Sequence, residues 1–236
     1  MNSIAIITAR GGSKRIPKKN IKEFIGKPII AYSIEAALNS CVYDEVMVST
    51  DSGEIKKVAL DYGAKVPFFR SCKTSDDYAT TADVLLEVLE KYNRLNRTFK
   101  YATCIYPTAP FITSEVLIKS MNLLKEKKVD TVIPVVKFSY PPQRGLIIDQ
   151  RGRLHMKWEE NMKIRSQDLE DIYHDSGKFY TFDVQAFLSK KKLITNNVIP
   201  IIEKENIVQD IDTISDWEMA EIKYRIMEEG KNGKNL

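Results

Sequence analysis

The first strand of this chain and the loop that follows it are encoded by residues 4–20, which read IAIITARGGSKRIPKKN. Ile4 to Ile7 form a short apolar run, which is typical of a buried strand, and this run leads into two adjacent glycines. Gly11 and Gly12 carry no Cβ, so their backbone N–H groups can approach phosphate oxygens closely. The spacing matches neither G-x-x-x-x-G-K-[S/T] nor G-x-G-x-x-G. The stretch therefore predicts a phosphate-binding loop of a different type at the end of a buried strand.

Positive charge is concentrated in the same part of the chain. The first 22 residues hold six basic side chains and no acid, so the rest of the chain carries 30 basic and 32 acidic side chains. A nucleic-acid-binding protein usually spreads its basic charge over a larger face and interleaves it with stacking aromatic residues. One dense loop suits a compact polyanion such as a nucleoside triphosphate, and we expect no nucleic acid partner. The alternative is an ordinary solvated basic turn, which the adjacent glycines make less favourable.

The segments that follow alternate between strand and helix patterns. Short apolar runs predict strands, and apolar residues at helical spacing predict helices between them. The strands are expected at 4–7, 45–51, 101–105 and 131–136, and the helices at 28–38, 55–60, 80–92 and 114–125. This alternation predicts an α/β fold of three layers, in which helices cover both faces of a mostly parallel, Rossmann-like sheet. The carboxyl ends of such strands share one rim, where residues 10–20, Asp51 and residues 106–110 should meet.

The pattern changes from about residue 137. Pro141 and Pro142 exclude a regular helix, and residues 145–155 resemble a β-hairpin. We expect residues 137–175 to form an inserted flap or small subdomain within a single domain that spans residues 1–229. Strand character returns at 178–183, an amphipathic helix is expected from Ile214 to Met227, and residues 230–236 are expected to form a disordered tail.

The cysteines and the N-terminus bear on the cellular compartment. Cys41, Cys72 and Cys104 are odd in number and form no C-x-x-C pair, so we expect reduced thiols and no zinc site. No apolar run approaches the ~20 residues of a membrane span, and no export signal opens the sequence. We therefore expect a cytoplasmic protein without membrane association.

Two aspartates near the C-terminus, Asp210 and Asp212, flank Ile211. In extended backbone alternate side chains face the same way, so both carboxylates can meet one cation while Ile211 turns inward. Ligands that are all oxygen favour magnesium over zinc. The alternative is that Asp212 caps the terminal helix, with Ser215 and Glu218 as parts of a capping box. The spacing alone leaves these two interpretations open.

The motifs of the chain, in their order and approximate spacing, resemble those of the acylneuraminate cytidylyltransferases, the enzymes that make CMP-sialic acids and their bacterial relatives. The resemblance covers nearly the whole chain. It includes the basic loop at 9–20, VSTD at 48–51, Arg70, YPTAP at 106–110, RSQD at 165–168, SGKFY at 176–180 and DIDT at 210–213. It implies a nucleotidyltransferase sheet, a homodimer, and a flap that serves dimerisation.

By position, the resemblance also assigns a nucleotide site. The residues expected to hold the phosphates and ribose of CTP are Ala9, Arg10, Gly11, Gly12, Ser13, Lys14, Lys19 and Asn20. Arg70 is expected to contribute to the nucleotide pocket, with Thr80 and Thr81 near the base. Without the resemblance, Arg70 could equally be an ordinary surface arginine, and Thr80 could cap the helix that it precedes.

The acceptor site is assigned in the same way, with departures from the commoner family pattern. Sialic acid members usually carry QPT[S/A]P, but Tyr106 takes the glutamine position here. Where R-x-N-G is usual, this chain has HDSG from His174, and residues 140–144 read YPPQR. These departures resemble the pseudaminic acid branch of the family. The residues expected to bind the sugar are Tyr106, Gln143, Arg144, Arg165, Gln167 and His174. Arg165 is the candidate for bidentate pairing with the sugar carboxylate, with Gln143 and Arg144 as competitors, and it could act in the partner's active site.

The resemblance implies that the anomeric hydroxyl of a free nine-carbon ulosonic acid attacks the α-phosphorus of CTP and that pyrophosphate leaves. Lys14, Lys19 and Asp212 are the expected catalytic residues, with Mg²⁺ held by Asp210 and Asp212. Three alternatives stay open. They are the same reaction on N-acetylneuraminic or legionaminic acid, another nucleotidyltransferase that uses a sugar 1-phosphate or an eight-carbon ulosonate, and a non-catalytic nucleotide-sensing module. The intact carboxylate pair and the basic loop favour catalysis over sensing.

Overall fold

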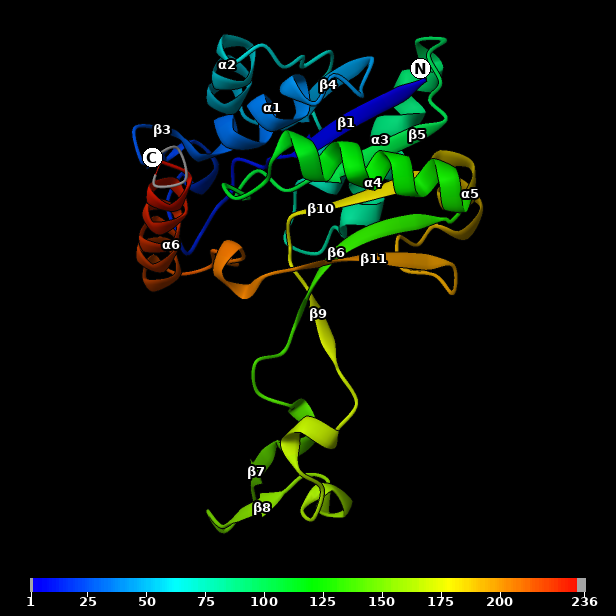
Figure 1. The fold of residues 1–236 in the computed structure, drawn as a ribbon. Helices are drawn as coiled ribbons and strands as arrows, with labels where there is room; N and C mark the ends of the chain where they lie inside the picture. Colours follow the sequence, from blue (N-terminus) through cyan, green and yellow to red (C-terminus); the bar gives the residue numbers. More distant parts are fainter. Residues whose placement is uncertain (1, 233–236) are drawn as a thin grey trace.

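A central sheet of seven strands organises the computed structural model, which describes residues 2–232. The strands are β1 (Ser3–Thr8), β4 (Glu45–Ser49), β5 (Tyr101–Ile105), β6 (Thr131–Lys137), β9 (Tyr173–Asp175), β10 (Phe179–Asp183) and β11 (Val198–Glu203). Their order is β11-β6-β10-β5-β1-β4, with β9 paired to β6 where β10 leaves it. β10 runs antiparallel to β5 and β6, whereas β1 with β4, β1 with β5 and β6 with β11 are parallel. The predicted mostly parallel α/β sheet is confirmed (Figure 1).

Helices cover both faces of this sheet. They are α1 (Ile29–Asn39), α2 (Gly53–Asp61), α3 (Thr81–Arg94), α4 (Ser114–Lys127), α5 (Val184–Lys190) and α6 (Ile214–Asn232). Alternate residues of β1 show the layering: Ala5 and Ile7 pack in the core that α1, α2 and α4 cover, whereas Ile4 and Ile6 pack in the core that α3 and α5 cover. Because successive strand residues point to opposite faces, β1 is apolar on both sides, as a central strand requires. The three predicted layers are therefore present.

Three elements of the sheet region, β9, β11 and α5, were not predicted. Pro200 interrupts the apolar run of β11, but β11 is an edge strand and tolerates a residue without an N–H donor. Helix α5 has only seven residues, too few to show a clear helical period. The antiparallel direction of β10 was also not predicted, because it depends on which strands flank it and not on its own residues.

A third apolar cluster joins the rim of the sheet to the C-terminal helix. Ile16 from the basic loop, Ile211 from between the two aspartates and Trp217 from α6 are all almost completely buried together with Phe24, at the small hairpin of β2 (Glu23–Phe24) and β3 (Lys27–Pro28). Segments nearly 200 residues apart in sequence are thus packed into one unit. This cluster fixes the basic loop next to the paired aspartates.

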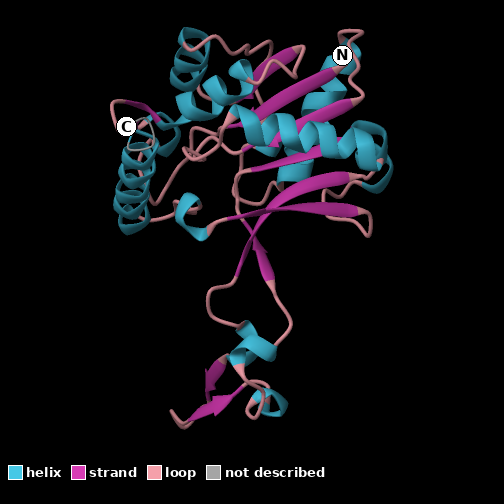
Figure 2. Ribbon diagram, in the orientation of Figure 1, coloured by secondary structure: helices cyan, strands magenta, loops and turns pink. Residues whose placement is uncertain are grey.

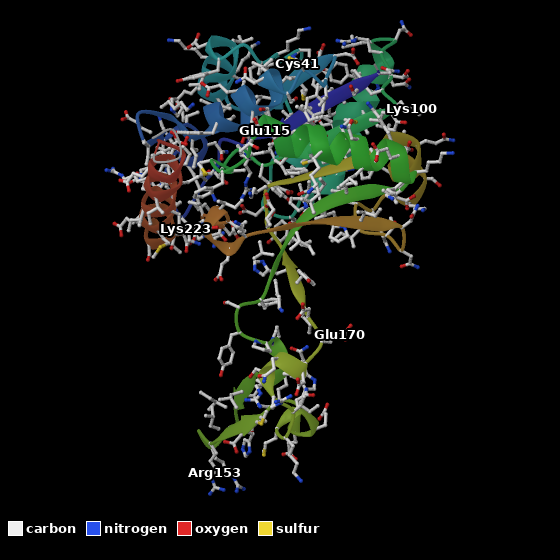
Figure 3. The ribbon with its side chains drawn as sticks, in the orientation of Figure 1. Cys41, Lys100, Glu115, Arg153, Glu170 and Lys223 are labelled. Atoms are coloured by element: carbon white, nitrogen blue, oxygen red, sulfur yellow. The ribbon has the colours of Figure 1, made fainter. Side chains whose placement is uncertain are left out.

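Between β6 and β9 the chain leaves the sheet and forms an arm, residues 138–172, that projects away from the rest of the structure (Figure 2). Its base is the antiparallel pairing of β6 with β9, and it carries the hairpin of β7 (Leu146–Ile148) and β8 (Leu154–Met156). Figure 3 shows Arg153 at the outer end of the arm and Glu170 nearer its base. Large apolar side chains of the hairpin are exposed, with Ile148 at 72% and Leu154 at 61%.

The C-terminal helix is longer than predicted. It was expected to end at Met227, with a tail from residue 230, but α6 continues through Gly230 to Asn232. Glycine in a helix costs only ~1 kcal/mol, which the preceding turns can offset. Residues 233–236 of the predicted tail lie outside the described residues. Within residues 2–232, no helix is long and apolar enough to cross a membrane.

Candidate active site

A polar cavity of about 420 Å³ opens at the carboxyl end of β1. It is lined mainly by the basic loop, with contributions from the segment before α3 and from the loop after β5. The lining residues are Thr8, Arg10, Ser13, Lys14, Arg15, Ile16, Lys19, Asn20, Asp77, Tyr106, Pro107 and Thr108. The loops after β1 and β5 therefore meet at one rim, as the strand pattern predicted.

The basic loop is held in shape by its own backbone and its neighbours. The Gly11 N–H donates to Asp51 Oδ1 at 2.7 Å, and Asn20 Nδ2 donates to the Arg10 carbonyl at 2.8 Å. A Cβ on Gly11 would lie 3.0 Å from Cβ of Ser52, so this position needs glycine for a close approach of two loops. In this structure the Gly11 N–H is thus bonded to Asp51, and the role of Gly11 as a phosphate donor stays a prediction. Ala9, which is fully buried, and Gly12 are also absent from the lining of the cavity.

The cations of the loop are paired with acidic or carbonyl groups from distant segments. Arg10 Nη1 lies 2.8 Å from Asp77 Oδ1, and Lys14 Nζ bonds the other oxygen of the same carboxylate. Arg15 Nη2 lies 2.7 Å from Asp212 Oδ1. Lys19 Nζ donates to the Ile211 carbonyl at 2.7 Å and lies 3.5 Å from Asp212 Oδ1. The loop is thus a set of organised cations, which argues against a merely solvated turn.

A smaller cavity of about 230 Å³ adjoins the first one and shares Thr8, Arg10, Asp77 and Tyr106 with it. Arg70, which is only 9% exposed, lines it and donates to the Ser49 carbonyl at 2.7 Å, so it is not an ordinary surface arginine. Thr81 lines the same cavity. Thr80 does not; it forms a capping box with Asp83 at the start of α3, so the helix-cap interpretation of Thr80 is confirmed.

A second large cavity, about 480 Å³, also has Tyr106 in its lining. It is lined by Lys19, Tyr106, Thr108, His174, Asp175, Ser176, Gly177, Tyr180, Val208, Asp210 and Asp212. The His174 ring packs against Phe138 with the ring centres 4.8 Å apart, and its Nδ1 lies 2.9 Å from the Asp175 carbonyl oxygen. The Tyr180 hydroxyl donates to the Asp175 carboxylate, and Thr81 Oγ1 lies 3.1 Å from the Tyr106 hydroxyl. Lys19, Tyr106 and Thr108 belong to both large cavities, so the two spaces meet at these side chains.

The paired aspartates lie in the second cavity with Ile211 fully buried between them, as predicted. The helix cap is a different residue: Thr213 Oγ1 accepts from the Asp216 N–H at 3.2 Å, and Asp216 Oδ2 accepts from the Thr213 N–H at 2.7 Å. The alternative that Asp212 caps α6 with Ser215 and Glu218 is therefore wrong. Burial, followed by the neighbouring Asp212 charge, raises the pKa of Asp210 above its ordinary value. Among residues 2–232 no group of three or more His, Cys, Asp and Glu side chains is placed to hold a metal, so these two carboxylates stand as a pair.

Comparison with known proteins identifies the family of this chain. Residues 4–223 match a protein family described as cytidylyltransferase. The chain belongs to the cytidylyltransferase family. The predicted membership of this family of nucleotidyltransferases is confirmed.

Individual relatives of this cytidylyltransferase match nearly its whole length. It is 41% identical over 229 residues to the pseudaminic acid cytidylyltransferase of Campylobacter jejuni, a match that covers 97% of this chain and 99% of that protein. It is 34% identical over 232 residues to the CMP-N,N'-diacetyllegionaminic acid synthase of Legionella pneumophila, covering 94% and 95%. A solved structure of a CMP:2-keto-3-deoxy-manno-octonic acid synthetase in complex with CTP has a TM-score of 0.70 at 16% identity, covering 97% of this chain and 100% of that one. At that identity the likeness concerns the fold alone.

The arm of this cytidylyltransferase carries four residues that were predicted to bind the sugar, and within one chain the structure does not bring them to the rim (Figure 2). Gln143 and Gln167 line a separate cavity of about 360 Å³ on the arm. Gln143 Nε2 donates to the Glu170 carbonyl at 2.7 Å, and Arg144 Nη2 donates to the Ile164 carbonyl at 2.6 Å. Arg165 makes two hydrogen bonds to the carboxylate of Asp168, at 2.7 and 3.2 Å. This geometry does not support contact between these four residues and a sugar in the rim cavities of the same chain.

Several residues of the rim cavities were missed by sequence reasoning. Arg15, Thr108 and Tyr180 lie inside motifs that carried the resemblance, and Asp175 lies in the HDSG departure, so the motif positions were a usable signal. Asp77 gave no such signal, because an acid before a helix is an ordinary feature of a surface. Only the packing of distant segments reveals it.

Proposed function

We propose that this enzyme transfers CMP from CTP to a nine-carbon ulosonic acid, with pseudaminic acid as the preferred acceptor, and releases pyrophosphate. The observation that carries the proposal is that a cation-lined cavity and a carboxylate-lined cavity meet at Lys19, Tyr106 and Thr108. Two substrates placed in these cavities would bring their reacting atoms together at that junction. Identity of 40–41% to two pseudaminic acid cytidylyltransferases across nearly the whole chain, against 34% to the legionaminic acid relative, supports this choice of acceptor.

The first cavity and its smaller neighbour suit CTP. Arg10, Lys14 and Lys19 provide positive charge for the triphosphate, and Ser13 and Asn20 provide polar groups for the phosphates or ribose. The smaller cavity, with Arg70 and Thr81, has room for a pyrimidine base beside the α3 N-terminus. Because a nucleoside triphosphate carries several negative charges, a cavity that concentrates cations binds it in preference to neutral ligands.

We propose that Asp210 and Asp212 hold Mg²⁺, and the donor set fits this ion. The two carboxylates line the same cavity, burial and then the Asp212 charge raise the pKa of Asp210, and oxygen ligands are those that Mg²⁺ prefers. When bound there, the ion would supply charge neutralisation for phosphate oxygens and acidify a nearby hydroxyl. Arg15 and Lys19 form ion pairs with Asp212 that partly balance its charge.

The chain's own residues then have distinct roles in the transfer. The bond between the anomeric oxygen and the α-phosphorus forms while the bond from that phosphorus to the bridging oxygen breaks, and pyrophosphate leaves. Lys14 and Lys19 would balance the charge that builds on the leaving group. The Ile211 carbonyl fixes Lys19 Nζ at 2.7 Å, which orients this cation towards the junction of the cavities. Catalysis of this kind consists of positioning and electrostatic stabilisation.

The second cavity and the arm suggest how the sugar is recognised. Tyr106 and His174 offer an aromatic wall with polar groups for the acceptor. The exposed apolar side chains of the arm hairpin suggest that the arm packs on a second copy of the chain. We propose a homodimer in which Arg165 of one protomer binds the sugar carboxylate in the active site of the other.

Pyrophosphate release tests the proposal. The purified enzyme is assayed with CTP, ATP, GTP or UTP and with free pseudaminic, legionaminic, N-acetylneuraminic and eight-carbon ulosonic acids. We expect CTP with pseudaminic acid to give the highest kcat/KM. Equal rates with UTP would contradict the cytidylyl assignment, and faster turnover of another sugar would contradict pseudaminic acid as the acceptor. Nucleotide binding with no pyrophosphate from any pair would favour a sensing module.

A further inference from the structure

An acidic side chain forms ion pairs with two cations of the first cavity. Asp77, from the segment between α2 and α3, places Oδ1 2.8 Å from Arg10 Nη1 and bonds Lys14 Nζ through Oδ2. Arg10 Nη1 also donates to the Asp76 carbonyl at 2.8 Å. Asp77 is itself part of the lining of the cavity. The carboxylate therefore stands where Arg10 and Lys14 would receive phosphate oxygens.

The Asp77 carboxylate is an anion that a bound phosphate can replace on Arg10 and Lys14. The bond from Lys14, and then the bond from Arg10, lowers the pKa of Asp77, so the carboxylate is ionised at neutral pH. The side chains of Asp77 and Lys14 are 44% and 77% exposed. Solvent-exposed ion pairs are weak because water and salt screen them. A triphosphate, with several charges on one molecule, can replace a single carboxylate on these two cations.

The segment that carries Asp77 is anchored away from the cavity. Glu87 on α3 accepts from the Ser71 N–H at 2.8 Å and from the Ser71 hydroxyl at 2.7 Å, and it also accepts from the Thr74 hydroxyl. Closer to the tip, Asp76 Oδ1 accepts from the Ala79 N–H at 2.8 Å. These bonds keep the backbone in place when the Asp77 side chain leaves its partners. The carboxylate therefore stays at a high effective concentration near Arg10 and Lys14.

We propose that Asp77 is an internal competitor of the nucleotide phosphates, which gives up Arg10 and Lys14 when the triphosphate binds and takes them back when pyrophosphate leaves. The inference rests on the proposed function in one respect: it requires that these two cations bind the phosphates of CTP. Its consequence is that the native enzyme holds polyphosphate less tightly than its cations allow. Weaker retention of pyrophosphate favours its release after the transfer.

The substitution Asp77→Asn separates this role from a structural one. Asparagine keeps the size of the side chain but cannot form the two ion pairs, so pyrophosphate and CTP no longer compete with a carboxylate. From the strength of exposed ion pairs, we expect binding to become tighter by on the order of three- to tenfold. A residue that only shaped the cavity would give unchanged or weaker binding when replaced. The sign of the change is therefore decisive.

A matched control removes the same charge from a neighbouring ion pair. Glu54 lies 2.8 Å from Lys18 of the basic loop, and Lys18 is not among the residues that line the cavities of the rim. Glu54→Gln thus has the same effect on net charge without freeing a cation inside the cavity. We expect it to alter polyphosphate affinity by less than twofold, since a remote surface charge is screened at physiological salt.

Calorimetric titration of sodium pyrophosphate and of CTP into the native enzyme and both variants tests the inference, first with EDTA and then with Mg²⁺. Tighter binding of both ligands by Asp77→Asn, at least threefold and larger than the change for Glu54→Gln, supports it. Equal gains in the two variants, or no gain in Asp77→Asn, overturn it while native CTP binding leaves the proposed function intact. Weaker binding by Asp77→Asn with Mg²⁺ alone also overturns it, because Asp77 would then serve a bound metal. If the native enzyme binds no CTP, the inference and the proposed function both fail.

Discussion

Replacement of Asp212 by asparagine is the sharpest test of the carboxylate pair. The side chain of Asp212 is 38% exposed, and its ion pairs with Arg15 and Lys19 span 2.7 and 3.5 Å. Exposed pairs of this kind contribute about 0–1 kcal/mol to stability, so Asp212→Asn should fold normally. The cap of α6 is untouched, because Thr213 and Asp216 provide it.

The effect on activity should be much larger. A neutral amide holds Mg²⁺ less tightly and leaves the phosphates less neutralised. Loss of a preorganised electrostatic group costs on the order of 10²–10³ in rate, or about 2.7–4 kcal/mol of transition-state stabilisation. We therefore expect Asp212→Asn to lose most of its pyrophosphate release at low Mg²⁺ and to regain part of it when Mg²⁺ is raised. Asp210→Asn should behave in the same way, since both side chains line one cavity.

The adjacent residue provides the control. Thr213→Ala removes the hydroxyl that caps α6 and should lower the free energy of unfolding by ~1 kcal/mol, with near-native turnover at a temperature well below its Tm. Thermal unfolding and initial rates across a Mg²⁺ series are measured for all three variants. Near-native turnover of Asp212→Asn at low Mg²⁺ would refute the reasoning and leave Asp212 as a counter-ion for Arg15. A Tm loss in Asp212→Asn as large as in Thr213→Ala would refute the assignment of the cap.

Two further predictions concern the anchor of the Asp77 segment and the arm. Burial alone would raise the pKa of Glu87, but bonds from Lys91, Thr74 and Ser71 outweigh it and lower the pKa from 4.5 to about 2. The stability that Glu87 provides is thus complete above pH 4.5 and is lost as the pH falls towards 2. In urea unfolding, the free energy of unfolding of the native enzyme should exceed that of Glu87→Gln by roughly 2 kcal/mol at pH 7 and by much less at pH 2.5. A difference that does not change with pH would show that the charge of Glu87 does not contribute. If Arg165 acts across the dimer, equal amounts of inactive Arg165→Ala and Asp212→Asn, mixed under conditions that allow subunit exchange, should recover ~25% of native turnover, because half of the dimers then contain one intact site; no recovery would place Arg165 in its own chain's site or outside catalysis.

The sequence by itself determined the parts of the enzyme whose signals are local. The apolar run of β1 followed by glycines, the alternation of strands and helices, and the carboxylates on either side of an inward-facing Ile211 follow from side-chain periods of 2 and 3.6 residues. Because parallel strands share a carboxyl rim, these local features also placed the loops after β1 and β5 together. The resemblance supplied the family, which the comparisons confirm.

Tertiary structure decided the features that depend on which distant segments meet. The sequence could not distinguish Asp212 from Thr213 as the cap of α6, because capping depends on backbone geometry that forms only when Ile211 and Trp217 pack with Ile16. The position of the arm residues away from the rim follows from the pairing of β6 with β9, which directs the intervening chain outward. The contact of Asp77 with Arg10 and Lys14 joins residues more than 60 positions apart. The energy of an ion pair depends on the distance between the charges in space and not on their separation in the chain. The sequence therefore cannot show which charged side chains pair until the fold brings two segments within a few ångströms.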